Sequence, residues 1–256
     1  MKYPLIIFIF IVVGVYVIGV SAQLGVENTG TIHGEVLLDG VVPDPPQIRA
    51  DRNVEVCGDV LSDNPLIVEN QRVQGAVISL DWQGDSVPQS NPAGERPELS
   101  LRGKHCRFDP RIQVAPVGAR LIVGSKDPIA HNPHGWWNHS KTVFNLTVLN
   151  PSFSFRRVLK RSGIYRIDCD THKWMKAYIH VFDHQFYAIT DENGRFIIPD
   201  VPIGRYILRA WHEVLGEQTV VLDVKVREKT ESVFKFPLFD HRDAKYKPAY
   251  ISPWPP

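Results

Sequence analysis

The sequence predicts an all-β fold made of two small β-sandwiches, preceded by a signal peptide. The 256 residues include 20 prolines and 18 glycines, which favour frequent turns. Short runs of alternating apolar and polar residues recur along the chain, and no stretch has convincing helical periodicity. The length is sufficient for one large domain or two small ones, each with its own core.

The N-terminal segment has the features of a secretory signal. Lys2 is followed by the uncharged apolar run 4–20, and the small residues Ser21 and Ala22 offer a cleavage site. We therefore expect residues 1–22 to be a signal peptide. The run is at the short limit for a membrane span, so an uncleaved anchor is the alternative. Both interpretations place the rest of the chain in the periplasm or outside the cell, with membrane contact only if the segment stays uncleaved.

Strand patterns follow in three groups. Residues 31–38 and 73–82 form the first group, and the polar, Pro- and Gly-containing stretch 83–102 after them is the best candidate for a domain boundary. The second group consists of short strands predicted at 99–108, 111–114, 120–124, 142–149, 154–159, 163–168 and 176–183.

The third group begins with a hairpin signal. Asn193-Gly194 lies between alternating apolar residues, and both turn positions favour a positive φ. Residues 201–208 are predicted to form a turn followed by a strand, and further strands are predicted at 219–226 and 232–236. Residues 238–256 are predicted to be an extended tail. Many short strands with Gly and Pro turns are typical of β-sandwiches.

Charge and cysteine content narrow the function classes. The 29 basic and 28 acidic residues give a net charge of +1, which argues against a nucleic-acid partner. Of the three cysteines, Cys169 lies among other metal-ligand residue types, so we assign it to a metal. Cys57 and Cys106 then remain as a predicted disulfide, since an exported protein matures in an oxidising compartment. Two separate buried thiols are the alternative.

The strongest chemical signal is residues 169–175 (CDTHKWM), which place a thiolate, an imidazole and a thioether at the spacing C-x2-H-x2-M. A cysteine and two histidines with a long axial methionine form the blue-copper arrangement. His131 follows an apolar strand and can supply the second imidazole. The sequence therefore predicts one type 1 copper ion on His131, Cys169, His172 and Met175. Zinc at the same residues, which the thioether disfavours, and a degenerate site that binds nothing are the alternatives.

Residues 99–183 resemble a cupredoxin, and amicyanin most closely. The resemblance is carried by Gly163-Ile164-Tyr165 before Cys169, by the short ligand loop and by His131 followed by Asn132. It implies a Greek-key β-sandwich and copper ligation by the four residues named above. It also implies that Asn132 braces the two ligand loops by hydrogen bonding.

The ligand loop departs from amicyanin in one respect, because Lys173 stands where that family has proline. The resemblance places His172 nearest to solvent, at the end of the barrel. We therefore expect electrons to pass through the His172 edge, with Lys173 and Trp174 in the surface that docks a redox partner.

The flanking regions resemble a carboxypeptidase-regulatory-like β-sandwich, through residues 30–36, 73–80, 188–196 and 201–206. The hypothesis is that residues 29–83 and 184–237 form this sandwich together and that the cupredoxin domain, 99–183, is inserted between its strands. The alternative is that the N-terminal strands extend the cupredoxin sheet. The whole chain is similar to bacterial proteins loosely named methylamine utilization proteins.

These features predict an exported electron carrier rather than an enzyme, because enzymatic copper oxidation normally needs a second copper centre and no second histidine cluster is visible. The partner would be a dehydrogenase, a cytochrome or an oxidase. Copper storage or delivery, and a surface binding module with a vestigial metal site, are the alternative functions.

Overall fold

The computed structural model of the protein describes residues 28–42, 44–45, 47–82, 96–138 and 140–237. Strands dominate these residues, and the one helix among them is the single turn α1 (Val54–Cys57). The predicted all-β class is confirmed. No helix of the described part is long and apolar enough to cross a membrane. The predicted signal peptide (1–22) and C-terminal tail (238–256) lie outside the described residues.

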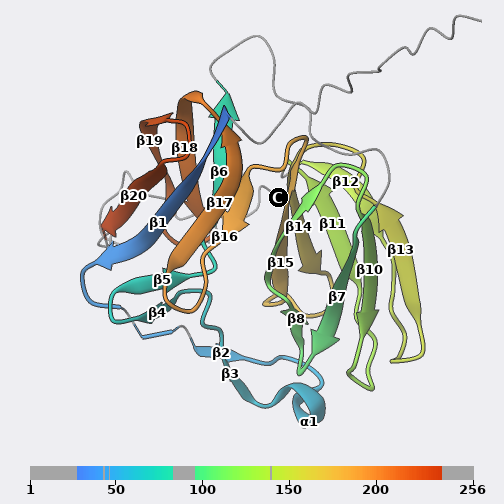
Figure 1. Cartoon of the computed structure of the whole chain (residues 1–256). Helices are drawn as coiled ribbons and strands as arrows, with labels where there is room; N and C mark the ends of the chain where they lie inside the picture. The colour runs from blue at the N-terminus through green and yellow to red at the C-terminus, as the bar shows by residue number, and fades with distance from the viewer. Residues whose placement is uncertain (1–27, 43, 46, 83–95, 139, 238–256) are drawn as a thin grey trace, which may run out of the picture.

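One sandwich takes its strands from both ends of the described chain (Figure 1). The long strand β1 (Thr29–Asp39) lies at its centre, antiparallel to β17 and parallel to β20. Ile32, Val36 and Leu38 of β1 face the core and are almost completely buried. The first sheet also contains β17 (Arg195–Pro202), β20 (Lys229–Pro237), β5 (Arg72–Gln74) and β4 (Ile67–Glu69), and the second contains β16 (Tyr187–Ile189), β6 (Val77–Trp82), β18 (Gly204–His212) and β19 (Gly216–Val224).

The second sandwich is built from the residues between these two sets of strands. One sheet has the order β13 (Ser154–Val158), β10 (Arg120–Ser125), β7 (Glu98–Lys104) and β8 (Arg107–Asp109). The other has the order β12 (Lys141–Asn145), β11 (Pro133–Trp137), β14 (Gly163–Cys169), β15 (Lys176–Phe182) and β9 (Ile112–Pro116). Its core includes the side chains of Cys169 and Met175. The end of this sandwich that carries Cys169 is the end that holds the site described below.

Three strand predictions were wrong. The predicted strand 73–82 is divided at Gly75, which has a φ of 81°, into β5 of the first sheet and β6 of the second. The predicted strand 99–108 is the hairpin β7–β8, because His105 and Cys106 adopt positive φ angles of 49° and 54° and reverse the chain. The strand β11 was missed because its sequence, PHGWW, contains a proline and a glycine, which both disfavour strands. Gly135 is required there, since a Cβ atom would lie 2.4 Å from the ring of Phe144.

A short chain segment leaves the first sandwich and contacts the second one. It consists of β2 (Gln47–Arg49), α1 and β3 (Val60–Ser62), and we call residues 47–62 the clip segment. Within the described residues, β2 and β3 pair only with each other. Figure 1 shows α1 close to the end of the second sandwich where β7 and β8 meet. The clip segment is tied there by the Cys57–Cys106 disulfide, which confirms the predicted pairing.

The two sandwiches meet through one apolar cluster and one buried ion pair. Tyr178 of β15 and Trp211 of β18 pack edge to face, with ring centroids 5.4 Å apart. Arg111, just before β9, donates two hydrogen bonds to the carboxylate of Glu213, at 2.5 and 2.8 Å, and a third to Asp63 at 3.0 Å. Since Glu213 is almost completely buried, its ionised carboxylate is stabilised by the pairing with Arg111.

Candidate metal centre

The four residues predicted to bind copper lie at one end of the second sandwich. His131 lies between β10 and β11, where its backbone pairs with Val148. Cys169 is the last residue of β14, and Met175 directly precedes β15. The loop between them is closed by two backbone hydrogen bonds, from Cys169 N–H to the Met175 carbonyl and from Met175 N–H to the His172 carbonyl. The fold therefore holds the loop residues as one compact turn.

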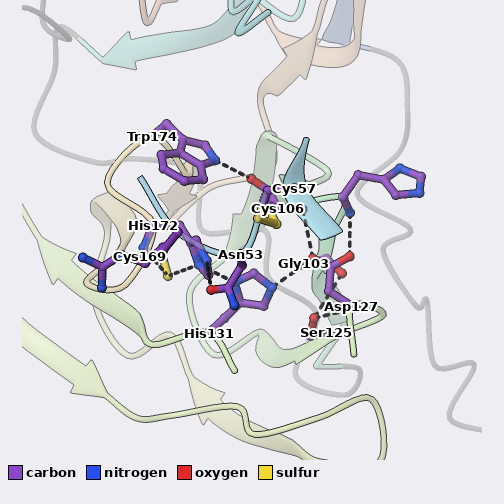
Figure 2. The surroundings of a disulfide bond; sticks show 12 residues. Asn53, Cys57, Gly103, Cys106, Ser125, Asp127, His131, Cys169, His172 and Trp174 are labelled. Carbon is purple, nitrogen blue, oxygen red and sulfur yellow. Dashed lines mark hydrogen bonds and ion pairs between the residues drawn. A yellow bond between two sulfur atoms is a disulfide. The ribbon is translucent and has the colours of Figure 1, made fainter. Parts of the chain in front are cut away.

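Three of the four side chains converge (Figure 2). The Nδ1 atoms of His131 and His172 are 3.1 Å apart, and the Cys169 Sγ atom is 3.8 Å from His172 Nδ1. All four side chains are at most 1 % exposed. Met175 lies in the same buried core as Cys169.

These separations fit a single metal ion. With about 2.0 Å from a metal to nitrogen and about 2.3 Å to thiolate sulfur, bond angles of roughly 100–130° place two nitrogens roughly 3.1–3.6 Å apart, and a nitrogen and a sulfur roughly 3.3–3.9 Å apart. The 3.1 Å separation of the two Nδ1 atoms lies within the first range, and the 3.8 Å separation of Cys169 Sγ and His172 Nδ1 lies within the second.

The outer nitrogen of each ring has a polar partner. His131 Nε2 lies 2.9 Å from the Asp127 carboxylate, and His172 Nε2 lies 3.1 Å from the Asn53 side-chain oxygen. Both partners accept hydrogen bonds, so each ring carries its proton on Nε2 when Nδ1 binds a metal. This is how buried partners fix the tautomer and orientation of ligating histidines.

Burial makes the neutral form of both rings the stable one. It lowers the pKa of His131, against the opposing effect of Asp127. Burial, followed by the effect of the neighbouring His131 ring, lowers the pKa of His172 to about 4. Neutral imidazole is the form that binds metals. At neutral pH both rings are therefore uncharged, and neither has to be deprotonated from the imidazolium form before it binds a metal ion.

The Cys169 sulfur is surrounded by backbone donors. The N–H groups of Asn132 and His172 both lie 3.4 Å from Sγ. Burial raises the pKa of the Cys169 thiol, and these two N–H groups oppose that rise. A coordinating metal ion deprotonates a thiol outright, and the two donors would then stabilise the thiolate.

A polar network joins the two ligand loops on the Cys169 side. The Asn132 side chain donates to the Asp170 carboxylate at 3.2 Å and accepts from the Thr147 hydroxyl at 3.2 Å. Asp170 also lies 3.2 Å from His134 Nδ1 and accepts from Asn145. The structure thus places Asn132 between the loop of His131 and the loop of Cys169.

The expectation that His172 is the ligand nearest to solvent was wrong. The His172 side chain is 0 % exposed, because Asn53 and the disulfide of the clip segment cover its outer edge. Lys173 is exposed, whereas Trp174 is partly buried and its ring N–H donates to the Cys106 carbonyl at 2.9 Å. Trp174 therefore packs between the ligand loop and the β7–β8 turn.

Sequence reasoning missed three residues that shape the centre. Asp127 precedes His131 by four residues, and only its carboxyl chemistry near a predicted ligand could have drawn attention to it. Asn53 is 119 residues from His172 in the sequence, so no local pattern connects the two. His134 lies three residues after His131, and its Nδ1 atom contacts the Asp170 carboxylate at 3.2 Å.

Comparison with known proteins gives partial structural matches only. No protein-family model matches the chain, and no curated protein matches its sequence. Among solved structures, the chain is similar to a purple cupredoxin from Nitrosopumilus maritimus, at 19% identity over 32% of this chain and 98% of that one, with a TM-score of 0.29.

Two other solved structures overlap a similar share of the chain. A variant of amicyanin in its reduced Cu(I) form has 12% identity over 41% of this chain and 98% of that one, with a TM-score of 0.30. A copper-containing nitrite reductase from Thermus scotoductus has 16% identity over 41% of this chain and 25% of that one, also with a TM-score of 0.30. These three structures, two cupredoxins and a copper enzyme, are each matched over less than half of this chain.

Proposed function

We propose that His131, Cys169, His172 and Met175 bind one type 1 copper ion and that the protein carries single electrons between redox partners. The observation that carries the proposal is the convergence of two neutral imidazoles and one thiol in a completely buried site. Their separations, 3.1 and 3.8 Å, match one shared ion. A methionine at the end of the same short loop would supply the weak axial sulfur of this kind of site.

Bound copper would supply a one-electron couple between Cu(I) and Cu(II). The chain's contribution is to hold the ligands still while the charge changes. Asp127 and Asn53 hold the two rings by their outer nitrogens, and two backbone N–H groups hold the sulfur. The surrounding core excludes water. Ligands that are fixed in this way need little rearrangement when an electron arrives or leaves.

The setting that we propose is the periplasm or the cell exterior, where disulfides such as Cys57–Cys106 persist. We propose a carrier rather than an enzyme, with a dehydrogenase, cytochrome or oxidase as its partner. The exposed charge of Lys173, next to His172, would contribute to docking. If it does, Lys173→Glu will change the salt dependence of reduction by the partner, and an unchanged dependence contradicts the assignment.

The direct test is to add Cu(II) to the purified protein and record visible absorption and EPR spectra. An intense thiolate-to-copper band with the EPR spectrum of a type 1 site is expected. Cys169→Ser should abolish the band, whereas the double variant Cys57→Ser/Cys106→Ser, which removes both cysteines outside the proposed ligand set and leaves no new free thiol, should retain it. A band that persists in Cys169→Ser would show that the ligand set is wrong.

One observation favours a second candidate, copper storage or delivery. Since His172 is completely buried beneath the clip segment, a partner cannot approach its ring edge as closely as it could approach an exposed histidine. Electron self-exchange separates the two functions. Fast exchange between reduced and oxidised protein supports the carrier, whereas slow exchange combined with rapid transfer of copper to an apo-acceptor supports storage or delivery.

A further inference from the structure

The disulfide lies directly beside the histidine pair (Figure 2). The sulfur atoms of Cys57 and Cys106 and one ring nitrogen of His172 are all within 4.8 Å of one another. The three residues are buried, with 8 % of Cys57 exposed and none of Cys106 or His172. Two sulfurs and a nitrogen therefore converge on one small volume that does not include Cys169.

A disulfide offers no thiolate, which is the form of cysteine that binds metals. Reduction by a dithiol changes this: the S–S bond breaks, two S–H bonds form, and the two thiols of the reductant lose two electrons and two protons to become its own disulfide. Cys57 and Cys106 then become two separate sulfur donors beside the same imidazole.

The two cysteines are held to different degrees. Cys106 lies in the turn between β7 and β8, where the Asp127 carboxylate accepts hydrogen bonds from the N–H groups of His105, at 2.6 Å, and Cys106, at 3.0 Å. Cys57 belongs to α1 in the clip segment, whose described strands pair only with each other. The Cys57 sulfur can therefore move away from Cys106 by a shift of the clip segment, without breaking a strand pairing of either sandwich.

We propose that the reduced pair Cys57 and Cys106, together with His172, binds a Cu(I) ion. Thiolate sulfur is the ligand type that selects Cu(I), and the buried volume keeps competing water away. Two sulfurs and one nitrogen are enough for Cu(I), whereas structural zinc almost always takes four ligands. This thiol site shares His172 with the proposed electron-transfer centre, but it is opened by reduction and does not need Cys169.

The test uses the full chain with Cys169→Ser, so that Cys57 and Cys106 are its remaining cysteines. One sample keeps the disulfide. A second is reduced with a dithiol, freed of it under nitrogen and assayed for two new thiols. Both are titrated with Cu(I) against a chromogenic Cu(I) chelator. The reduced sample is expected to gain one equivalent of bound Cu(I), with the near-ultraviolet absorption of a Cu(I)–thiolate complex, and equal binding by the two samples overturns the proposal.

A further variant distinguishes Cu(I) binding at the folded site from Cu(I) binding by thiols in an unfolded chain. His172→Gln, added to Cys169→Ser, keeps both thiols and removes the nitrogen donor. The proposed site loses at least tenfold in Cu(I) affinity, whereas thiols in an unfolded segment would bind equally well with or without this ring. Unchanged affinity in the reduced His172→Gln protein therefore also overturns the proposal. Since neither measurement uses Cys169, the thiol site and the type 1 centre can fail independently.

Discussion

The two histidines of the metal centre are held by two different regions of the chain. His131 is held from within its own sandwich by Asp127, whose carboxylate also fixes the turn at His105 and Cys106. His172 is held by Asn53, which belongs to the clip segment and pairs with no strand of that sandwich. The comparison teaches that half of the support for this centre is local and half is supplied by a remote part of the chain.

The position of Asn53 depends on how firmly the clip segment is fixed to the second sandwich. Arg111 of the second sandwich contributes to this, and it also connects the two sandwiches. Its guanidinium binds Glu213 of the first sandwich and Asp63, the residue that follows the clip segment. Arg111→Ala leaves the buried Glu213 carboxylate unpaired, and we expect a loss of about 3–5 kcal/mol in the free energy of unfolding, measured by urea denaturation.

Arg209→Ala is the matched control for Arg111→Ala. Arg209 also pairs with two carboxylates, those of Asp81 and Glu217, but its side chain is 34% exposed. We expect a loss of less than about 1 kcal/mol there. Equal losses in the two variants would mean that the Arg111 cluster is not a special anchor.

A third buried histidine, His212, gives a reference outside the metal centre. Its Nδ1 accepts the Val214 N–H, and burial, followed by the charge of Arg111, lowers its pKa to about 4. The unfolded chain therefore binds more protons than the folded one between about pH 6.5 and pH 4, so stability is lost as the pH falls through this window.

For His212 alone the expected loss is on the order of 3 kcal/mol. The measurement is urea unfolding of the metal-free protein at a series of pH values, with His212→Gln compared directly. The variant should show a flatter dependence on pH, and the slope that remains in it includes His131, His172 and His184, whose pKa values burial also lowers. Identical slopes in both proteins would contradict the assignment.

Removal of the Asp127 carboxylate, the local support, should lower stability and copper affinity more than removal of the Asn53 side chain, the remote support. Asp127→Ala deprives three donors of their acceptor, and we expect a loss of about 2–3 kcal/mol in stability and a 10–100-fold loss in copper affinity. Asp127→Asn retains one acceptor oxygen and should lose less on both counts. Copper competition with a chelator and urea unfolding provide the two measurements.

The smallest effect is expected for the remote support. Asn53 has a φ of 50°, so Asn53→Gly removes its side chain without introducing backbone strain. We expect a loss of about 1 kcal/mol in stability and about tenfold in copper affinity. Asn70→Gly, at an exposed residue with a φ of 49°, should leave copper affinity unchanged. An affinity loss in Asn53→Gly that exceeds the loss in Asp127→Ala would reverse the comparison.

Much of the fold could be predicted because its signals are local. Alternation of apolar residues marks strands such as β14, and a continuous apolar run marks β10. Asn193-Gly194 marks a turn in which Gly194 has a φ of 66°, but the predicted hairpin was wrong, because the strands on either side, β16 and β17, pair with β6 and β1 and not with each other. The strand β11 could not be predicted, since its Pro and Gly are tolerated only because of what packs against them, such as the Phe144 ring over Gly135. Local propensity was overridden there by tertiary packing.

The candidate site divides in the same way. Cys169, His172 and Met175 share one short motif, and His131 follows a recognisable strand, so all four could be named from residue type and spacing. The burial of His172 could not, because the residue that covers it, Asn53, belongs to a segment with no strand pairing to that sandwich. Spacing along a chain indicates which residues share a loop, but not which distant segment closes over them.

The bond between Cys57 and Cys106 joins residues 49 positions apart, one inside and one outside the sandwich that carries the proposed ligands. A recombinant fragment that begins at β7 would contain His131, Cys169, His172 and Met175 but would lack both Cys57 and Asn53. Its Cys106 would become a free sulfhydryl prone to cross-linking, and the imidazole of His172 would be laid open to small anions and to other proteins. Anyone who excises or transplants this copper-binding unit therefore needs to take residues 47–62 along with it.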